Sequence, residues 1–65
     1  MVKYPEIKVK LVGQDGNAFA ILGRVRKALR MAGVPEEEVE KFTAEATAVD
    51  YPNLLCTVMR WVDVE

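Results

Sequence analysis

The chain has 65 residues, nine lysines and arginines against ten aspartates and glutamates, no histidine, and a hydrophobic fraction of 51%. This composition excludes the highly charged, weakly hydrophobic class of disordered proteins. A net charge of −1 lacks the overall basic character of a typical nucleic-acid-binding protein. The length predicts one domain over residues 1–65. Because so small a domain buries a comparatively low share of its surface, self-association would add stability.

Cysteine usage and hydropathy bear on the compartment. The single cysteine, Cys56, excludes an internal disulfide. The start of the sequence shows no secretory hydrophobic segment, and no apolar run approaches the roughly 18 residues of a membrane span. We therefore expect a soluble, cytoplasmic protein that does not contact a membrane.

The first predicted element is a β-strand over residues 6–12. Ile7, Val9 and Leu11 alternate with charged residues, which is the period of a half-buried strand. Proline is tolerated at the first residue of a strand, so Tyr4 and Pro5 mark where the strand is entered.

A single strand leaves backbone donors and acceptors that need partners. Three partners remain open: the C-terminal residues 61–65, the middle residues 43–48, and the same strand of a second protomer, which would make a dimer. The C-terminal segment and the second protomer are favoured over the middle segment, which has a better helical pattern.

The longest predicted element is a helix over residues 17–33. Its hydrophobic residues recur on one stripe at about 100° per residue. This stripe consists of Ala18, Ile21, Leu22, Val25, Ala28, Leu29 and Ala32. Asn17 is the predicted N-cap, Gly33 suits the left-handed position after the helix, Val34 can make the accompanying hydrophobic contact, and Pro35 prevents continuation.

Two further helices are predicted, over residues 35–48 and from Pro52 to about Val62. In the first, Pro35 suits the first helical position, the following glutamates suit the positive end of the helix dipole, and four hydrophobic residues keep a helical rhythm. These four are Val39, Phe42, Ala46 and Val49. The second carries a stripe of Leu54, Leu55, Val58, Trp61 and Val62. Strand readings of residues 43–48 and 57–62 remain as alternatives.

Three stretches cover nearly the whole chain: GNAFAILGRVRKALRMAG, PEEEVEKFTAEATA and DYPNLLCTVMRWVDVE. Together they resemble a family of short, uncharacterised proteins of bacteria and their phages or plasmids. The resemblance implies a compact protein with an accessory or host-interaction role on mobile elements, and it supplies no active site. The family tends to have glycine before the Asp-Tyr pair and an acidic residue after it, where this chain has Val49 and Pro52, so the turn before the last helix is where the chain departs from the pattern.

The residue types that usually carry catalysis are scarce. Histidine and serine are absent, so the commonest general base and the commonest metal ligand are missing. Cys56 is predicted on the polar side of its helix near Arg60, where a cation could activate it, but it is more simply an incidental surface thiol.

The glutamates of residues 36–40 have the pattern of a helix start and lack the spaced partners of a metal site. The turn at residues 13–17 precedes a helix but matches no phosphate-binding motif. We expect no enzyme activity, cofactor or metal.

The strongest candidate surface lies opposite the stripe of the long helix. Helical spacing places Phe19, Gly23, Arg26, Lys27 and Arg30 on one face. An aromatic ring with three cations suits an acidic partner, a nucleotide or single-stranded nucleic acid. A glycine inside a helix costs about 1 kcal/mol relative to alanine, which the close approach of another molecule would explain. The simpler interpretation is that Phe19 packs on a neighbouring segment, that Gly23 permits internal packing, and that the cations partly complement the glutamates across the helix–helix turn.

The sequence thus predicts an α+β domain with an N-terminal strand, a long central helix and two shorter helices, with a short C-terminal strand as one of the two favoured partners of the first strand. As function we expect a non-enzymatic interaction module that forms a homodimer and binds an unknown protein. The alternative is a small nucleotide- or nucleic-acid-binding protein that uses Phe19, Arg26, Lys27 and Arg30.

Overall fold

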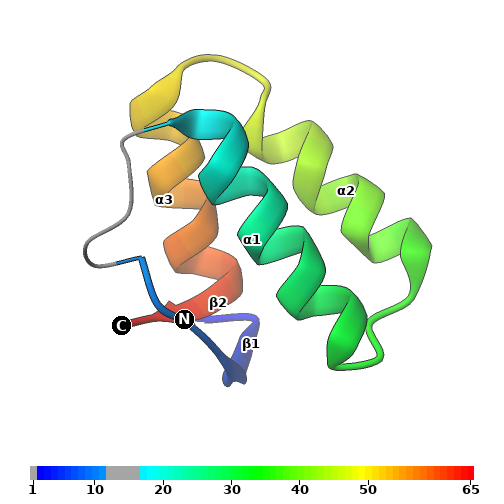
Figure 1. Cartoon of the computed structure of the whole chain (residues 1–65). Coiled ribbons are helices and arrows are strands. Elements are labelled where there is room, and N and C mark those ends of the chain that lie inside the picture. Colours follow the sequence, from blue (N-terminus) through cyan, green and yellow to red (C-terminus); the bar gives the residue numbers. More distant parts are fainter. Residues whose placement is uncertain (1, 12–16) are drawn as a thin grey trace.

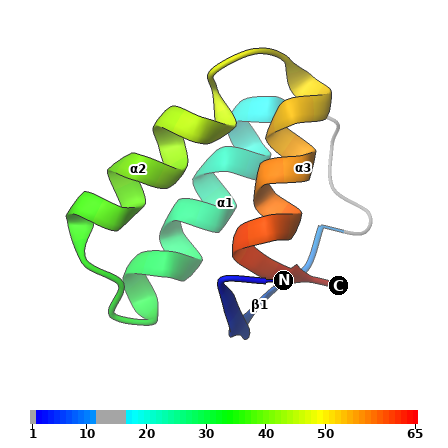
Figure 2. The ribbon, with the colours of Figure 1, turned by 180° about the vertical axis from the view of Figure 1, so that it is seen from behind.

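The computed structural model describes residues 2–11 and 17–65 and shows an α+β fold (Figure 1). In chain order the elements are β1 (Tyr4–Val9), α1 (Ala18–Met31), α2 (Glu36–Ala46), α3 (Tyr51–Trp61) and β2 (Val62–Val64). The three helices pack against one another, and the two strands lie across one end of the helical layer. Viewed from behind in Figure 2, α3 lies in front of α1, and the strands again lie together at the same end. The predicted fold class is confirmed.

The partner of the first strand is the C-terminal segment. β1 and β2 pair in parallel, with Lys8 opposite Asp63 and Val9 opposite Val64. Beyond the strands, Glu65 N–H donates to the Val9 carbonyl at 2.9 Å. All three helices lie between the two strands in the chain and form the long connection that a parallel pair requires.

The bounds of the first strand differ from the prediction. β1 begins at Tyr4 and ends at Val9, so Lys10 and Leu11 follow the strand, and Val12 lies outside the described residues. Pro5 is within the strand, where the register with β2 is irregular between Tyr4 and Lys8. Proline has no N–H to give to a ladder, so a break in pairing at this position costs little.

Both ends of α1 follow the predicted caps. The Asn17 side chain accepts a hydrogen bond from the Phe19 N–H at 2.9 Å. At the other end Gly33 has φ of +87°, its N–H donates to the Arg30 carbonyl, and the Val34 N–H donates to the Leu29 carbonyl at 3.0 Å. These two bonds are the pattern of a helix closed by a left-handed glycine.

The other two segments are mainly helical, so the strand readings of residues 43–48 and 57–62 are wrong, except at Val62, where β2 begins. α2 is shorter than predicted at both ends: Pro35 is the N-cap rather than the first helical residue, and the helix ends at Ala46. At the start of α3, Asp50 Oδ1 accepts a hydrogen bond from the Asn53 N–H at 3.0 Å. Asp50 is the N-cap of α3, which therefore begins at Tyr51, one residue before the predicted Pro52, and ends at Trp61.

The core is formed by all five elements. Its largest fully buried side chains include Val25, Leu29, Val39, Phe42 and Val58. Two predicted core positions are wrong. Ala32 is exposed because α1 ends at Met31, and Val49 is 77% exposed because it follows the end of α2.

Candidate functional site

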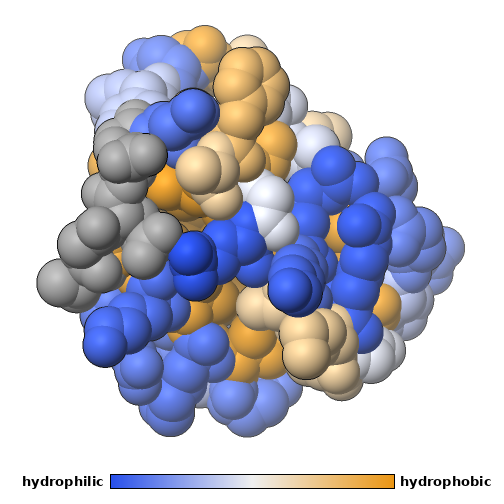
Figure 3. Space-filling model, in the orientation of Figure 1, coloured by the Kyte–Doolittle hydropathy of each residue, from blue (hydrophilic) through white to orange (hydrophobic). Residues whose placement is uncertain are grey.

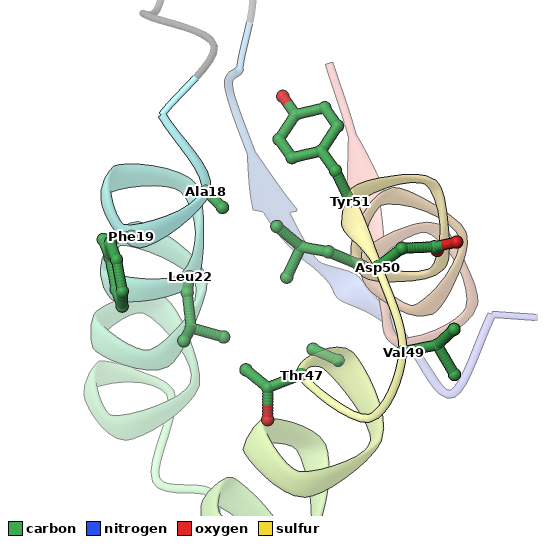
Figure 4. Close-up of a pocket in the computed structure, with 9 residues that line it drawn as sticks. Ala18, Phe19, Leu22, Thr47, Val49, Asp50 and Tyr51 are labelled. Atoms are coloured by element: carbon green, nitrogen blue, oxygen red, sulfur yellow. The ribbon is translucent and has the colours of Figure 1, made fainter.

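An apolar groove lies where α1 begins, between its first turns and the connection from α2 to α3 (Figure 4). Its volume is about 280 Å³. The lining residues are Ala18, Phe19, Leu22, Ala46, Thr47, Val49, Asp50, Tyr51 and Leu54. We call this set the α1 groove.

The floor and the rim of the α1 groove differ in exposure. Leu54 is buried and Leu22 is half-buried, and in Figure 4 Leu22 points from α1 toward Thr47. Phe19 lies on the flank of α1 and is 84% exposed. Val49 points away from the groove in the same view. The groove is therefore a hydrophobic recess with hydrophobic side chains that project from its edge.

Local hydrogen bonds hold the walls in place. Asn17 caps the helix that carries Phe19 and Leu22. The Asn53 amide group donates to the Glu45 carbonyl at 2.8 Å, which joins the start of α3 to the end of α2. Asp50, the carboxylate on the rim, already accepts from the Asn53 N–H. The groove is formed by helix packing, and its rim carboxylate has a partner within the chain.

The predicted face of α1 is divided by the way α2 packs beside it. Arg30 Nη2 lies 2.9 Å from Glu36 Oε2, and a second bond runs from Arg30 Nε to Glu36 Oε1. Arg26 Nη2 lies 3.6 Å from Glu40 Oε2. Two of the three predicted cations therefore face glutamates of α2, as the simpler interpretation of complementary charges predicted.

The remaining three residues have open surroundings. Phe19 is exposed, so it does not pack on a neighbouring segment among the described residues. A Cβ added at Gly23 would meet nothing within 4 Å, so internal packing does not require glycine there. Lys27 is exposed and turns toward β1, where it lines a second hollow with Lys8 and Lys10. The structure keeps Phe19 and Gly23 accessible on one face of α1, and ion pairs with α2 engage Arg26 and Arg30 on that face.

Ion pairs lower the pKa values of two glutamates on α2. The hydrogen bond from Arg30 lowers the pKa of Glu36, against a smaller opposing effect of desolvation. The hydrogen bond from Lys3 in the same way lowers the pKa of Glu38. Both carboxylates are thus held in the charged form by cations from neighbouring segments.

The groups considered for catalysis are placed as follows. Cys56 is exposed, and the Arg60 guanidinium donates to the Thr57 hydroxyl at 3.2 Å. Within the described part of the chain, no three histidines, cysteines or acidic residues are grouped as a metal site would need. The turn at residues 13–16 lies outside the described residues.

In residues 2–11 and 17–65, no helix has the length and apolar character needed to cross a membrane.

Comparisons with protein-family models, with curated proteins and with solved structures gave no match to this chain. The functional argument consequently depends on the geometry of the chain itself.

Sequence reasoning found Phe19 but not the α1 groove. The other wall comes from residues 47–51, which were assigned partly to a helix and partly to a turn. The sequence pattern gave no signal for this wall, since Val49 was predicted on the hydrophobic stripe of the second helix. Packing of α1 against α2 and α3 creates the recess, and a pattern along one helix cannot show it.

Proposed function

We propose that this chain is a non-enzymatic, cytoplasmic interaction module that associates with a second copy of itself through the α1 groove. The observation that supports this proposal is the exposed Phe19 ring beside a hydrophobic recess. Aromatic side chains contribute large apolar areas to interfaces. Hydrophobic residues gather at this end of the molecule in the space-filling view, whereas hydrophilic residues cover much of the middle of the same face (Figure 3).

A second copy fits this surface because one patch carries both a projection and a recess. In a twofold dimer, Phe19 of each protomer would lie in the groove of the other, so every favourable contact would occur twice. Asp50 keeps its hydrogen bond to Asn53 on association, so dimerisation would not bury a carboxylate without a donor. Such a module suits the accessory role that the resemblance to short phage and plasmid proteins implies.

The test is the oligomeric state of a matched pair of variants, measured by sedimentation velocity over a range of concentrations. Phe19→Asp should weaken the dimer by about a hundredfold or more, since two aromatic side chains leave the interface and each contributes roughly 1.5 kcal/mol or more. Met59→Asp is the control, because Met59 is also exposed but does not line the groove. A wild-type chain that stays monomeric at the highest concentration would contradict the proposal.

A small nucleotide- or nucleic-acid-binding protein is the second candidate. The exposed Phe19 ring, on which a base could stack, supports it. The ion pairs of Arg26 and Arg30 with α2 count against it, because these cations would have to leave carboxylates to reach phosphates. Titration of labelled oligonucleotides and nucleotides at two salt concentrations tests it: phosphate contacts predict a steep loss of affinity with salt, and no binding at low salt rules it out.

A further inference from the structure

A second hollow of about 250 Å³ lies between the end of β1 and the second half of α1. Four of the residues that line it are cationic. Lys8 is in β1 and Lys10 directly follows that strand, whereas Arg24 and Lys27 are in α1. The hydrophobic part includes Ala28 and Met31. We call these six residues the basic hollow. In Figure 3 hydrophilic residues gather over this part of the molecule, with hydrophobic surface showing between them.

Helix and strand periodicity explain why the cations meet. Arg24, Lys27 and Met31 are three and four residues apart, so they share one face of α1. Lys8 and Lys10 are two residues apart, as on one side of an extended segment. Because β1 packs against α1, the two sets converge on one hollow.

Among the described residues that line the hollow, four are cationic and none is acidic, in a chain with a net charge of −1. The carboxylate of Asp63 compensates the charge of Lys8, since Lys8 Nζ lies 2.8 Å from Asp63 Oδ2. This bond, with the charges of Asp63 and Glu65, raises the pKa of Lys8. Lys10 and Lys27 are exposed. A ligand that supplies negative charge on the α1 side would therefore be attracted to the hollow.

The hydrophobic part of the hollow decides the kind of anion. Met31 is 78% exposed, and methionine adapts its shape to hydrophobic partners. None of the described residues that line the hollow is aromatic, so it offers no platform for stacking bases. We propose that the basic hollow binds an acidic amphipathic segment of a partner protein, whose carboxylates contact Lys10 and Lys27 and whose hydrophobic side chain packs on Met31 and Ala28.

The partner is a different protein and not a second copy. The acidic run of this chain lies at the start of α2, where Glu36 is bonded to Arg30 and Glu38 to Lys3. The hydrophobic residue within that run, Val39, is fully buried. The run therefore offers no free hydrophobic side chain to a neighbouring molecule.

The test is fluorescence anisotropy with three labelled probes: a short peptide of glutamate and leucine in an amphipathic helical repeat, the same peptide with each leucine replaced by serine, and oligothymidylate. Lys27→Glu should weaken binding of the glutamate–leucine peptide by about tenfold, because an attraction becomes a repulsion. Lys41→Glu, on α2 and outside the hollow, is the matched control and should change it by less than about twofold. Met31→Ser should weaken binding of the leucine-containing peptide only.

Three results would overturn the proposal: no binding of the glutamate–leucine peptide at low salt, equal effects of Lys27→Glu and Lys41→Glu, or tighter binding of oligothymidylate with no effect of Met31→Ser. Phe19→Asp should retain peptide binding, because Phe19 lies in the α1 groove and not in the basic hollow. The two proposals can thus fail separately.

Discussion

The indole N–H of Trp61 donates a hydrogen bond to Oε1 of Glu45, 3.1 Å away. Trp61 is a core residue in edge contact with Phe42, with ring centroids 5.5 Å apart. A buried indole needs an acceptor for its N–H, and α2 supplies one from the residue before its last. The bond joins the end of α3 to the end of α2.

Glu45→Ala should lower the free energy of unfolding by about 1–3 kcal/mol, because the buried Trp61 N–H would lose its partner. Glu45→Gln is the matched control, since its amide oxygen still accepts a hydrogen bond. Urea denaturation followed by tryptophan fluorescence measures both. Equal stability of the two variants would show that the hydrogen bond contributes little.

Alanine at the two glycines that flank the second half of α1 should act in opposite directions. Gly23→Ala should stabilise the fold by about 1 kcal/mol, because the position is helical and a Cβ meets nothing within 4 Å. Gly33→Ala should destabilise it by about 1–2 kcal/mol, because φ of +87° is strained for any residue with a Cβ. Thermal unfolding of both variants checks the pair, and a loss of stability in Gly23→Ala would contradict the open surroundings of that position.

The Lys3–Glu38 ion pair should make stability fall at both extremes of pH. The hydrogen bond from Lys3 lowers the pKa of Glu38, so its contribution is present above the ordinary value of 4.5 and is lost as pH falls through the lowered value. The same bond raises the pKa of Lys3, so its contribution is present below 10.5 and is lost as pH rises through the raised value.

Unfolding measured across the pH range tests this coupling. Glu38→Gln should flatten the loss of stability below pH 4.5, because the charge that titrates there is gone. Glu37→Gln, at an exposed position on the same helix, is the control. If both variants lose stability below pH 4.5 as steeply as the wild type, the ion pair does not contribute to stability in acid.

The central helix was the most predictable element because its signals are local. Asn17 and Gly33 act within one turn of the helix ends, and both perform the roles that residue type and position predicted. The stripe of Ile21, Val25 and Leu29 is buried as expected. Each of these features follows from backbone geometry that the neighbouring residues determine.

Features that depend on contacts between distant segments were harder to predict. Alternation in residues 6–12 indicated a strand but did not identify its partner. The pairing of Tyr4 with Val62 places the start of the strand two residues earlier in the chain than predicted. Val49 continued a helical rhythm that the end of α2 interrupts. The α1 groove and the basic hollow each combine residues from different segments, and their shapes follow from packing.

The sequence indicated which groups of charged residues complement one another, but it did not identify the partner of each charged residue. The basic and acidic runs indicated complementary faces across the α1–α2 turn, and Arg30 with Glu36 shows this. The sequence did not indicate that Lys27 would turn to the other side and meet Lys8 and Lys10. The orientation of α1 on β1 decides that division.

The parallel pairing of β1 with β2 has a consequence for the order of folding. Lys8 and Asp63 are 55 positions apart in the chain, so closing this contact early would restrict a long loop for a small number of hydrogen bonds. Contacts within and between adjacent helices need much shorter closures. We expect the helices to assemble first and to bring the strands together, which makes the sheet the last part of the fold to form and the first to open.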